Sequence, residues 1–221
     1  QLTREDLKIL YTYNEDELFY RTLYFEKKEH PETFHKFCLN LDCDLISRRQ
    51  LYVPELQKEG WHSYFEEKAM FCDTADNIIL YKHYRYTPEF IHEHEFFEIL
   101  CIYDGQAHTS IQGIEHTLHK GDVCIIPPHT KHSIGIFDDS IAFNILIRGS
   151  TFQSTFFQSL TEDSARLIFF AHVLYRKTEG NYLIFHTAND PQIREMLENL
   201  YIEYLGHEEY SYTFFKFHAD S

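Results

Sequence analysis

Short apolar runs alternate with turn residues through the middle of the chain. Between residues 76 and 149, segments rich in β-branched and aromatic residues recur about every eight to twelve residues. Many short strands at this spacing predict a mainly β domain, either a sandwich or a barrel. Asp104-Gly105 and Gln112-Gly113 have the composition of two-residue hairpin turns, because their central positions tolerate positive φ.

The first 75 residues carry helical signals instead. Apolar positions in residues 3–28 follow a helical period, and Asn14 has the character of a second helix cap inside this segment. Pro31 suits the first position of another short helix. Residues 40–60 have no clear period and are predicted to be irregular. We therefore expect a mostly helical extension over residues 1–75.

The period changes again after Gly149. Helical spacing predicts an amphipathic helix over residues 167–175 and a second helix that is capped by Asp190 and ends at Gly206, while residues 182–185 form a short strand or a buried turn. The apolar stripe of the second helix packs either on the β domain or in a subunit interface. The last residues begin another helical pattern that breaks off without a terminator, which we interpret as a chain cut before a further domain.

Composition narrows the class of protein. With 35 acidic and 20 basic residues, the formal net charge is −15, which argues against direct nucleic-acid binding because phosphate contacts need clustered lysine and arginine. The five cysteines form no CxxC pair and are interpreted as reduced core thiols. The sequence has no apolar run long enough to span a bilayer and no signal-peptide pattern. We expect a soluble, cytoplasmic protein that does not bind membranes.

Histidine and glutamate residues cluster near the start of the β region. His92, His94, Phe96 and Glu98 alternate along one predicted strand, so their side chains are expected to share a face. His132 follows on a later strand. Three imidazoles and one carboxylate on an inward face are suitable ligands for iron, manganese, nickel or zinc, and the residue types alone do not choose among these metals.

Other roles remain open for these side chains. They contact a small molecule without a metal, or they form hydrogen bonds that only stabilise the fold. Asn144 lies in an apolar strand and is either a pocket residue or a satisfied buried amide. Phe96 either lines the pocket or belongs to the core. The candidate ligand-binding residues are His92, His94, Phe96, Glu98, His132 and Asn144, and the candidate metal ligands among them are His92, His94, Glu98 and His132.

Two motifs in this region resemble those of the cupin superfamily. The first motif, an HxH followed by a glutamate and a glycine, is met by His92, His94, Glu98 and Gly105. The second runs from a glycine through a proline to a histidine and is met by Gly121, Pro127 and His132. His129 stands where a glycine is usual and Ile136 where an asparagine is usual. The resemblance implies a cupin barrel, that is, a double-stranded β-helix or jelly roll.

The sequence around these motifs is similar to the N-terminal sensor half of bacterial AraC/XylS-type transcription regulators. The similarity includes FFEI after the HxH, then GDVCIIPP and FNILIR, and later YLIF before an acidic amphipathic helix, over roughly residues 75–215. Together with the helical signals of the N-terminal extension (1–75), the resemblance implies an effector-binding barrel (76–149) and a helical dimerisation segment (150–221). In that family the effector is often a sugar, and a separate C-terminal pair of helix-turn-helix motifs binds DNA.

We therefore predict a sensor that is not an enzyme and has no catalytic residues. It forms a homodimer through its C-terminal helices, and it reaches DNA only through a helix-turn-helix domain absent from this sequence. The alternative is a metal-dependent cupin enzyme, such as a dioxygenase or a sugar isomerase. A third interpretation is a purely structural dimerisation module whose barrel is filled by side chains. The sequence contains no GxSxG, GxGxxG or Walker motif.

Overall fold

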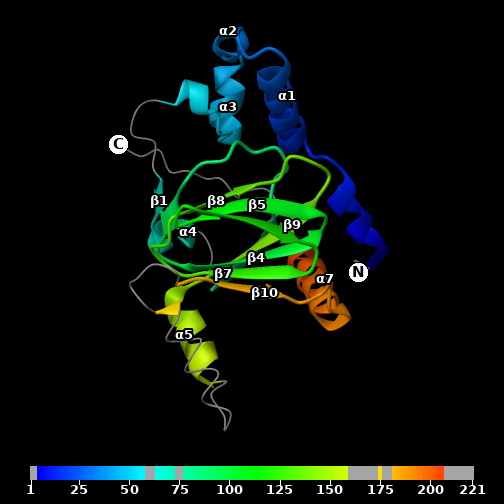
Figure 1. Ribbon diagram of the computed structural model, residues 1–221, viewed down its shortest axis with the longest axis vertical. Helices are drawn as coiled ribbons and strands as arrows, with labels where there is room; N and C mark the ends of the chain where they lie inside the picture. Colours follow the sequence, from blue (N-terminus) through cyan, green and yellow to red (C-terminus); the bar gives the residue numbers. More distant parts are fainter. Residues whose placement is uncertain (1–3, 58–62, 73–76, 159–173, 176–180, 207–221) are drawn as a thin grey trace.

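Two antiparallel sheets form the centre of the protein (Figure 1). The computed structural model describes residues 4–57, 63–72, 77–158, 174–175 and 181–206. One sheet has five strands in the order β10-β7-β4-β9-β2, and the other has three in the order β6-β5-β8. The predicted mainly β fold with flanking helices is confirmed. The strands of the two sheets are β2 (Ile78–Lys82), β4 (Phe97–Asp104), β5 (Gln106–Ile111), β6 (Ile114–His119), β7 (Asp122–Ile126), β8 (His132–Gly135), β9 (Ile141–Ile147) and β10 (Leu183–His186).

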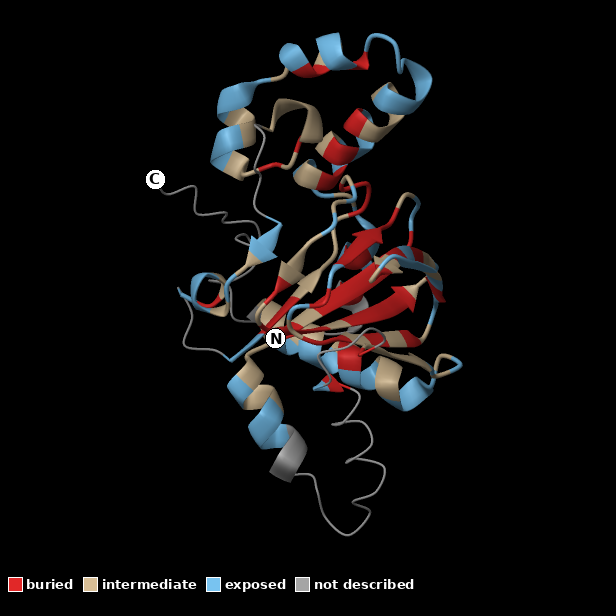
Figure 2. Ribbon diagram, turned by 60° about the vertical axis from the view of Figure 1, so that its left-hand side comes forward, coloured by how far each residue is buried: buried red, intermediate tan, exposed pale blue. Residues whose placement is uncertain are grey.

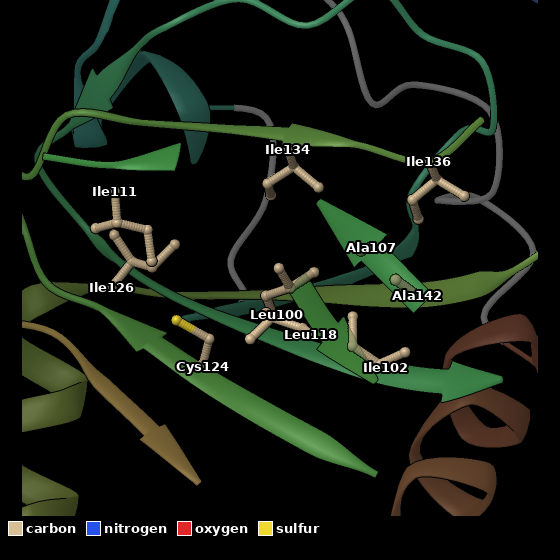
Figure 3. Close-up of a cluster of buried hydrophobic side chains, with 10 residues drawn as sticks. All are labelled: Leu100, Ile102, Ala107, Ile111, Leu118, Cys124, Ile126, Ile134, Ile136 and Ala142. Atoms are coloured by element: carbon tan, nitrogen blue, oxygen red, sulfur yellow. The ribbon is translucent and has the colours of Figure 1, made fainter. Parts of the chain in front are cut away.

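Apolar side chains from both sheets fill one part of the space between them (Figure 3). Leu100 and Cys124 come from the five-stranded sheet, and Ile111 and Ile134 come from the three-stranded sheet. Burial alternates along strands such as β5 and β7, as expected when one face of a sheet is covered. Figure 2 shows that the strands are the most buried elements and that the helices expose their outer faces.

The two predicted hairpin turns have different outcomes. Gln112 and Gly113 both have positive φ, and they join the paired residues Ile111 and Ile114 of β5 and β6, so this hairpin is confirmed. The prediction for Asp104-Gly105 is wrong. β4 pairs with β7 and β9, whereas β5 pairs with β6 and β8, so the chain crosses from one sheet to the other at Gly105. Gly105 does adopt the expected positive φ of 73°.

Short helices dominate the N-terminal extension. Asn14 caps α1 with a reciprocal capping box, which confirms a break between two helices in this segment. The prediction that residues 40–60 are irregular is wrong in part, because Asp42 accepts a hydrogen bond from Leu45 N and starts a seven-residue helix. The elements are η1 (Arg4–Tyr11), α1 (Glu15–Glu29), α2 (Phe34–Leu39), α3 (Cys43–Arg49), η2 (Pro54–Leu56), β1 (Tyr64–Phe65), α4 (Glu67–Met70) and β3 (Glu93–His94), and β1 pairs with β3.

A buried ionic cluster fixes α1 to the barrel. The carboxylate of Glu17 accepts hydrogen bonds from Arg85 Nε at 2.9 Å and from Lys82 Nζ at 3.0 Å. Glu17 and Arg85 are almost completely inaccessible to solvent. Arg85 Cζ also lies 3.6 Å from the centre of the Tyr13 ring, an arrangement that favours a cation–π interaction. The N-terminal helices are therefore anchored by a small set of charged contacts.

The C-terminal segment adds a strand to the larger sheet and a helix to its outer face. β10 pairs antiparallel with β7, which confirms the strand alternative for residues 182–185. α5 (Gly149–Gln158) precedes it, and α7 (Pro191–Gly206) follows. The buried stripe of α7, including Leu197, packs on Tyr103 and Phe143, which confirms packing against the β domain.

The rest of the C-terminal region is partly exposed or lies outside the described residues. Met196 and Leu200 of α7 are 54% and 41% exposed, so its apolar surface is only partly covered. The predicted helix over residues 167–175 lies largely outside the described residues, as does the pattern after Gly206. Within the described parts of the chain, no helix has the length and apolar character needed to cross a membrane.

Candidate functional site

A buried polar cluster occupies the part of the barrel that the apolar core does not fill. Glu98 of β4 is at its centre. Its Oε2 atom lies 3.1 Å from His94 Nε2 and 3.3 Å from His132 Nε2, and its Oε1 atom accepts a hydrogen bond of 2.6 Å from Asn144 Nδ2. Glu98, His94, His132 and Asn144 are all buried. The structure thus brings together residues from β3, β4, β8 and β9 that the sequence predicted as a site.

The local backbone differs from the single strand expected for residues 92–98. β3 ends at His94 and β4 begins at Phe97, so that prediction is wrong. His92 pairs instead with His132 through two backbone hydrogen bonds of 2.9 Å. This pairing brings the two imidazole centroids within 4.2 Å of each other. The histidines therefore converge because two separate segments pair, and not because they alternate along one strand.

Phe96 supports the cluster from one side. Its ring stacks on His94 with centroids 4.3 Å apart and planes inclined by 11°. The same ring packs with Phe71, Ile79 and Leu146 in a separate apolar cluster. Phe96 is thus both a core aromatic and a neighbour of the candidate site, and direct contact with a bound molecule stays a prediction.

Backbone carbonyl groups determine which nitrogen of each imidazole carries hydrogen. His94 Nδ1 lies 2.7 Å from Phe96 O, His132 Nδ1 lies 2.8 Å from Thr130 O, and His92 Nδ1 lies 3.2 Å from Phe90 O. A carbonyl oxygen only accepts hydrogen bonds, so Nδ1 is the protonated nitrogen in all three rings. In the neutral form of each ring, Nε2 then has a free lone pair.

In this cluster the environment favours the ionised form of Glu98 and the neutral forms of His92 and His94. Burial acts to raise the pKa of Glu98, but the Nε2–H groups and positive charges that His132 and His94 carry when they are protonated outweigh it and hold the pKa well below its usual range. Burial lowers the pKa of His92 well below its usual value, and the neighbouring His132 adds to this effect. Burial also lowers the pKa of His94, although the hydrogen bond to Glu98 opposes the change. An ionised carboxylate therefore faces imidazoles that disfavour a positive charge.

This donor set fits a metal ion. A lone pair on Nε2 directed at a carboxylate oxygen is repulsive unless a proton or a cation lies between them. Ligand atoms of His92, Glu98 and His132 all lie within 4.8 Å of one another, and Nδ1–H bonded to a carbonyl is the usual second contact of a metal-bound histidine. His94 contacts Glu98 but is outside this compact trio. His92, Glu98 and His132 would hold the ion, which would act as a Lewis acid towards an oxygen of a bound molecule.

Tyr81 belongs to the cluster although the sequence did not single it out. Asn144 Nδ2 donates a hydrogen bond of 2.9 Å to the Tyr81 hydroxyl, and the two residues are directly opposite each other on β2 and β9. Burial raises the pKa of Tyr81 well above its usual value, with a further contribution from the Glu98 charge. The alternation in IILYKHYRY places Tyr81 on the face opposite to Lys82, but it places Ile79 and His83 on that face as well.

Aromatic residues from outside the barrel line the cluster on the His92 side. The ring centroid of His92 lies 4.7 Å from that of Phe90 and 5.5 Å from that of Phe65. Tyr52 packs in turn on Phe90, with centroids 5.0 Å apart. Phe65 and Tyr52 could not be identified from the sequence, because local periodicity carries no information about which part of the extension folds back onto the barrel.

Comparison with known proteins finds relatives of a short stretch of this chain. The chain is 33% identical over 57 residues to the HTH-type transcriptional activator RhaS of Yersinia pestis (strain Pestoides F) and to RhaS of Yersinia pseudotuberculosis serotype O:1b (strain IP 31758). Each match covers 26% of this chain and 21% of the relative, so the chain matches about a fifth of the length of these curated relatives.

Two solved structures are similar to about a third of this chain. A cupin protein from Bacteroides fragilis has 21% identity and a TM-score of 0.30, with 37% of this chain and 75% of that chain covered. KdgF from Halomonas sp. has 20% identity and a TM-score of 0.30, with coverage of 33% and 70%.

A family model covers most of the region that contains the barrel and its C-terminal additions. It is described as the AraC-like ligand binding domain, and it matches residues 79–213, which is more than half of the chain. The matched region contains both sheets of the barrel except for the first residue of β2, and it also contains the buried polar cluster and α7. This chain belongs to the AraC-like ligand binding domain family.

Proposed function

We propose that this chain is the effector-sensing and dimerisation part of a transcription regulator. A small polar metabolite, such as a sugar, binds in the barrel, and the chain forms a homodimer through its C-terminal helices. DNA binding belongs to a helix-turn-helix domain of the whole regulator. The protein acts in the cytoplasm, in keeping with cysteines that are all unpaired.

The buried polar cluster is the observation that carries this proposal. A domain that only dimerised would gain stability from an apolar barrel interior, because buried polar groups cost free energy unless they are fully paired. Here an ionised Glu98 faces the Nε2 atoms of His94 and His132, and no lysine or arginine is bonded to it among the described residues. Such a set of acceptors favours a bound partner. Aromatic walls with a few polar groups are typical of sites for small molecules.

Strands β4 and β9 connect this site to the outer face of the sheet. Glu98 and Asn144 point into the barrel, whereas Tyr103 and Phe143 of the same strands pack under α7. A ligand that moved these strands would therefore also change the position of α7 on the sheet. Binding shifts the placement of the helix only if the effector has different affinities for the two arrangements.

A metabolite panel tests the sensor function. The complete gene product is screened for ligands by thermal unfolding, and each ligand found is added in measurements of dimer equilibrium and of affinity for promoter DNA. We expect at least one ligand to change the dimer equilibrium or the DNA affinity. A demonstrated ligand that changed neither quantity would contradict the proposal.

A metal-dependent cupin enzyme is the second candidate, because His92, Glu98 and His132 form a compact set of metal ligands. This function predicts about one metal ion per chain in purified protein, and turnover of a substrate that His132→Ala abolishes. His119→Ala is a suitable control, because that side chain is exposed on β6. Metal binding without any turnover across the same panel would favour the sensor, with the ion as part of the effector site.

A further inference from the structure

Segment 64–71, which contains β1 and α4, holds the bend of the chain that follows His94. Glu95 lies in this bend. Its carboxylate accepts a hydrogen bond of 2.7 Å from the Tyr64 hydroxyl and one of 3.0 Å from Glu67 N. Its backbone N–H also donates a hydrogen bond of 3.0 Å to a carbonyl group of β1. These bonds attach segment 64–71 to the chain directly beside the candidate site.

The same segment holds the start of α5. Glu67 Oε2 accepts a hydrogen bond of 2.7 Å from the backbone N–H of Gly149, the first residue of that helix. Because the first N–H groups of a helix have no partner within it, the Glu67 carboxylate caps α5. Glu67 thus bonds Glu95 through its backbone and α5 through its side chain.

Phe71 makes a second connection between the bend and α5. Its ring packs edge-on against Phe96 in the bend, with centroids 5.8 Å apart. Its carbonyl oxygen accepts a hydrogen bond of 3.1 Å from Arg148, whose guanidinium carbon lies 4.6 Å from the centre of the Phe71 ring. Arg148 directly precedes α5. Segment 64–71 therefore contacts both the bend and the start of α5 through more than one residue.

The helix α5 leaves the barrel from this point. It extends away from the two sheets (Figure 1), so the contacts at its start have a strong effect on its direction. Phe97, which follows the bend, adds a direct contact, because its ring stacks on Phe152 of α5 with centroids 3.8 Å apart. The family model matches residues 79–213, so segment 64–71 lies outside the matched region. Its contacts are thus additional to those of the matched domain.

We propose that segment 64–71 is a bridge that couples the position of the bend after His94 to the position of α5. A molecule that binds at the candidate site and displaces the bend also displaces Glu67 and Phe71, and with them the start of α5. The proposal rests on the proposed sensor function and gives it a second route, separate from the route through β4, β9 and α7. Coupling between two places is reciprocal, so a change at α5 also alters the bend.

Amide hydrogen exchange, followed residue by residue by NMR on the whole chain, tests the bridge without a ligand. Glu67→Ala removes the cap and should speed exchange in the first turn of α5 about fivefold, the ratio that corresponds to the loss of one helix cap. Glu67→Gln keeps an acceptor oxygen and should restore most of the protection. Glu66→Ala is the matched control, because the neighbouring Glu66 is exposed and its side chain makes no capping hydrogen bond.

Glu95→Ala tests transmission from the bend. Glu95 bonds segment 64–71, so its loss should reach α5 through Glu67 and speed exchange in the first turn of α5 by about twofold or more. Glu93→Ala is the control, because the Glu93 side chain has no hydrogen-bond partner among the described residues. The amides of β5 serve as the internal reference, since a general loss of stability would speed their exchange as well.

Two substitutions at Gly149 test transmission in the opposite direction. Gly149→Pro removes the N–H that Glu67 accepts, and proline suits the first position of a helix. It should speed exchange of the Glu67 amide, which is bonded to Glu95, by about twofold or more. Gly149→Ala keeps the N–H, and its Cβ would lie at an ordinary contact distance of 3.5 Å from Glu67 Oε2, so it should leave this amide unchanged.

Each result decides the proposal. Unchanged exchange in α5 on Glu95→Ala, unchanged exchange of the Glu67 amide on Gly149→Pro, or equal effects of Glu93→Ala and Glu95→Ala would overturn the bridge. The fate of the sensor function is distinguishable. A metabolite that controls DNA affinity equally in the parent and in Glu67→Ala leaves the sensor and removes the bridge. Coupled exchange without any metabolite that changes dimer equilibrium or DNA affinity retains the bridge and removes the sensor.

Discussion

Arg85 holds both carboxylate oxygens of Glu17, with Nε 2.9 Å from Oε1 and an Nη atom 3.0 Å from Oε2. The two residues come from the segment after β2 and from the first turn of α1, and both are buried. The same carboxylate closes the capping box with Asn14. One glutamate thus starts α1, pairs with Arg85 and fixes the N-terminal helices to the barrel.

Removing this carboxylate should be strongly destabilising. Glu17→Ala leaves the buried Arg85 and Lys82 without their anion, and the loss of one partner of a buried pair typically costs about 3–5 kcal/mol. Lys27→Ala is the matched control, because the Lys27–Glu55 pair is largely exposed on the lysine side and should contribute at most about 1 kcal/mol. Urea unfolding of both variants measures the difference. Equal losses would show that the buried cluster is not an anchor.

Glu17 also predicts how stability depends on pH. Burial acts to raise its pKa, but the hydrogen bond and charge of Arg85 and the charge of Lys82 outweigh burial, and the pKa is lowered from the ordinary 4.5. A depressed carboxylate pKa stabilises the folded state fully above the unfolded value, and this contribution is lost as pH falls below about 4.5. The stability advantage of the parent over Glu17→Gln should therefore be constant from pH 7 to 5 and shrink below that. An advantage that grew on acidification would contradict this assignment.

Two glycines with similar φ should respond differently to alanine. Gly105 and Gly113 have φ of 73° and 79°, so alanine is strained at both, by about 1–2 kcal/mol. At Gly105 a Cβ would also lie 2.0 Å from Ser140 Oγ, whereas at Gly113 no atom lies within 4 Å of it. Gly105→Ala should therefore lose about 1–3 kcal/mol more than Gly113→Ala. Thermal unfolding of the pair measures this, and equal losses would mean that Ser140 moves away freely.

Local sequence patterns predicted the elements of the barrel better than their connections. Alternation identified the strands after Phe97, and the positive φ of Gly105 was expected from its turn chemistry. The partner of β4 was not predictable in this way, because pairing with β9 depends on contacts between distant segments. The helix after Asp42 was missed because seven residues are too short to establish a period.

The sequence likewise identified some residues of the candidate site and not others. Motif spacing identified the histidines and Glu98, although the backbone bends between His94 and Phe97 where a single strand was expected. Asn144 was identified as a polar residue in an apolar strand, and the structure adds its hydrogen bond to Glu98. Phe65 and Tyr52 required the tertiary fold, because a sequence pattern gives no distance between the extension and His92.

The exposed side of α7 gives a test of the proposed dimer. Met196 and Leu200 are apolar and partly exposed, whereas Leu197 is 5% exposed and packs on the sheet. Because an aspartate would need desolvation in an apolar interface, Met196→Asp and Leu200→Asp should weaken dimerisation by about tenfold or more, with an unchanged melting midpoint of the monomer.

Leu197→Asp provides the contrast, because a charge under α7 should destabilise the fold itself, by several kcal/mol. Sedimentation equilibrium over a range of concentrations measures association, and circular dichroism measures folding. If both surface variants kept the parent dimer constant, the interface would have to lie elsewhere, since these two side chains are the exposed apolar surface of α7 within the described part of the helix.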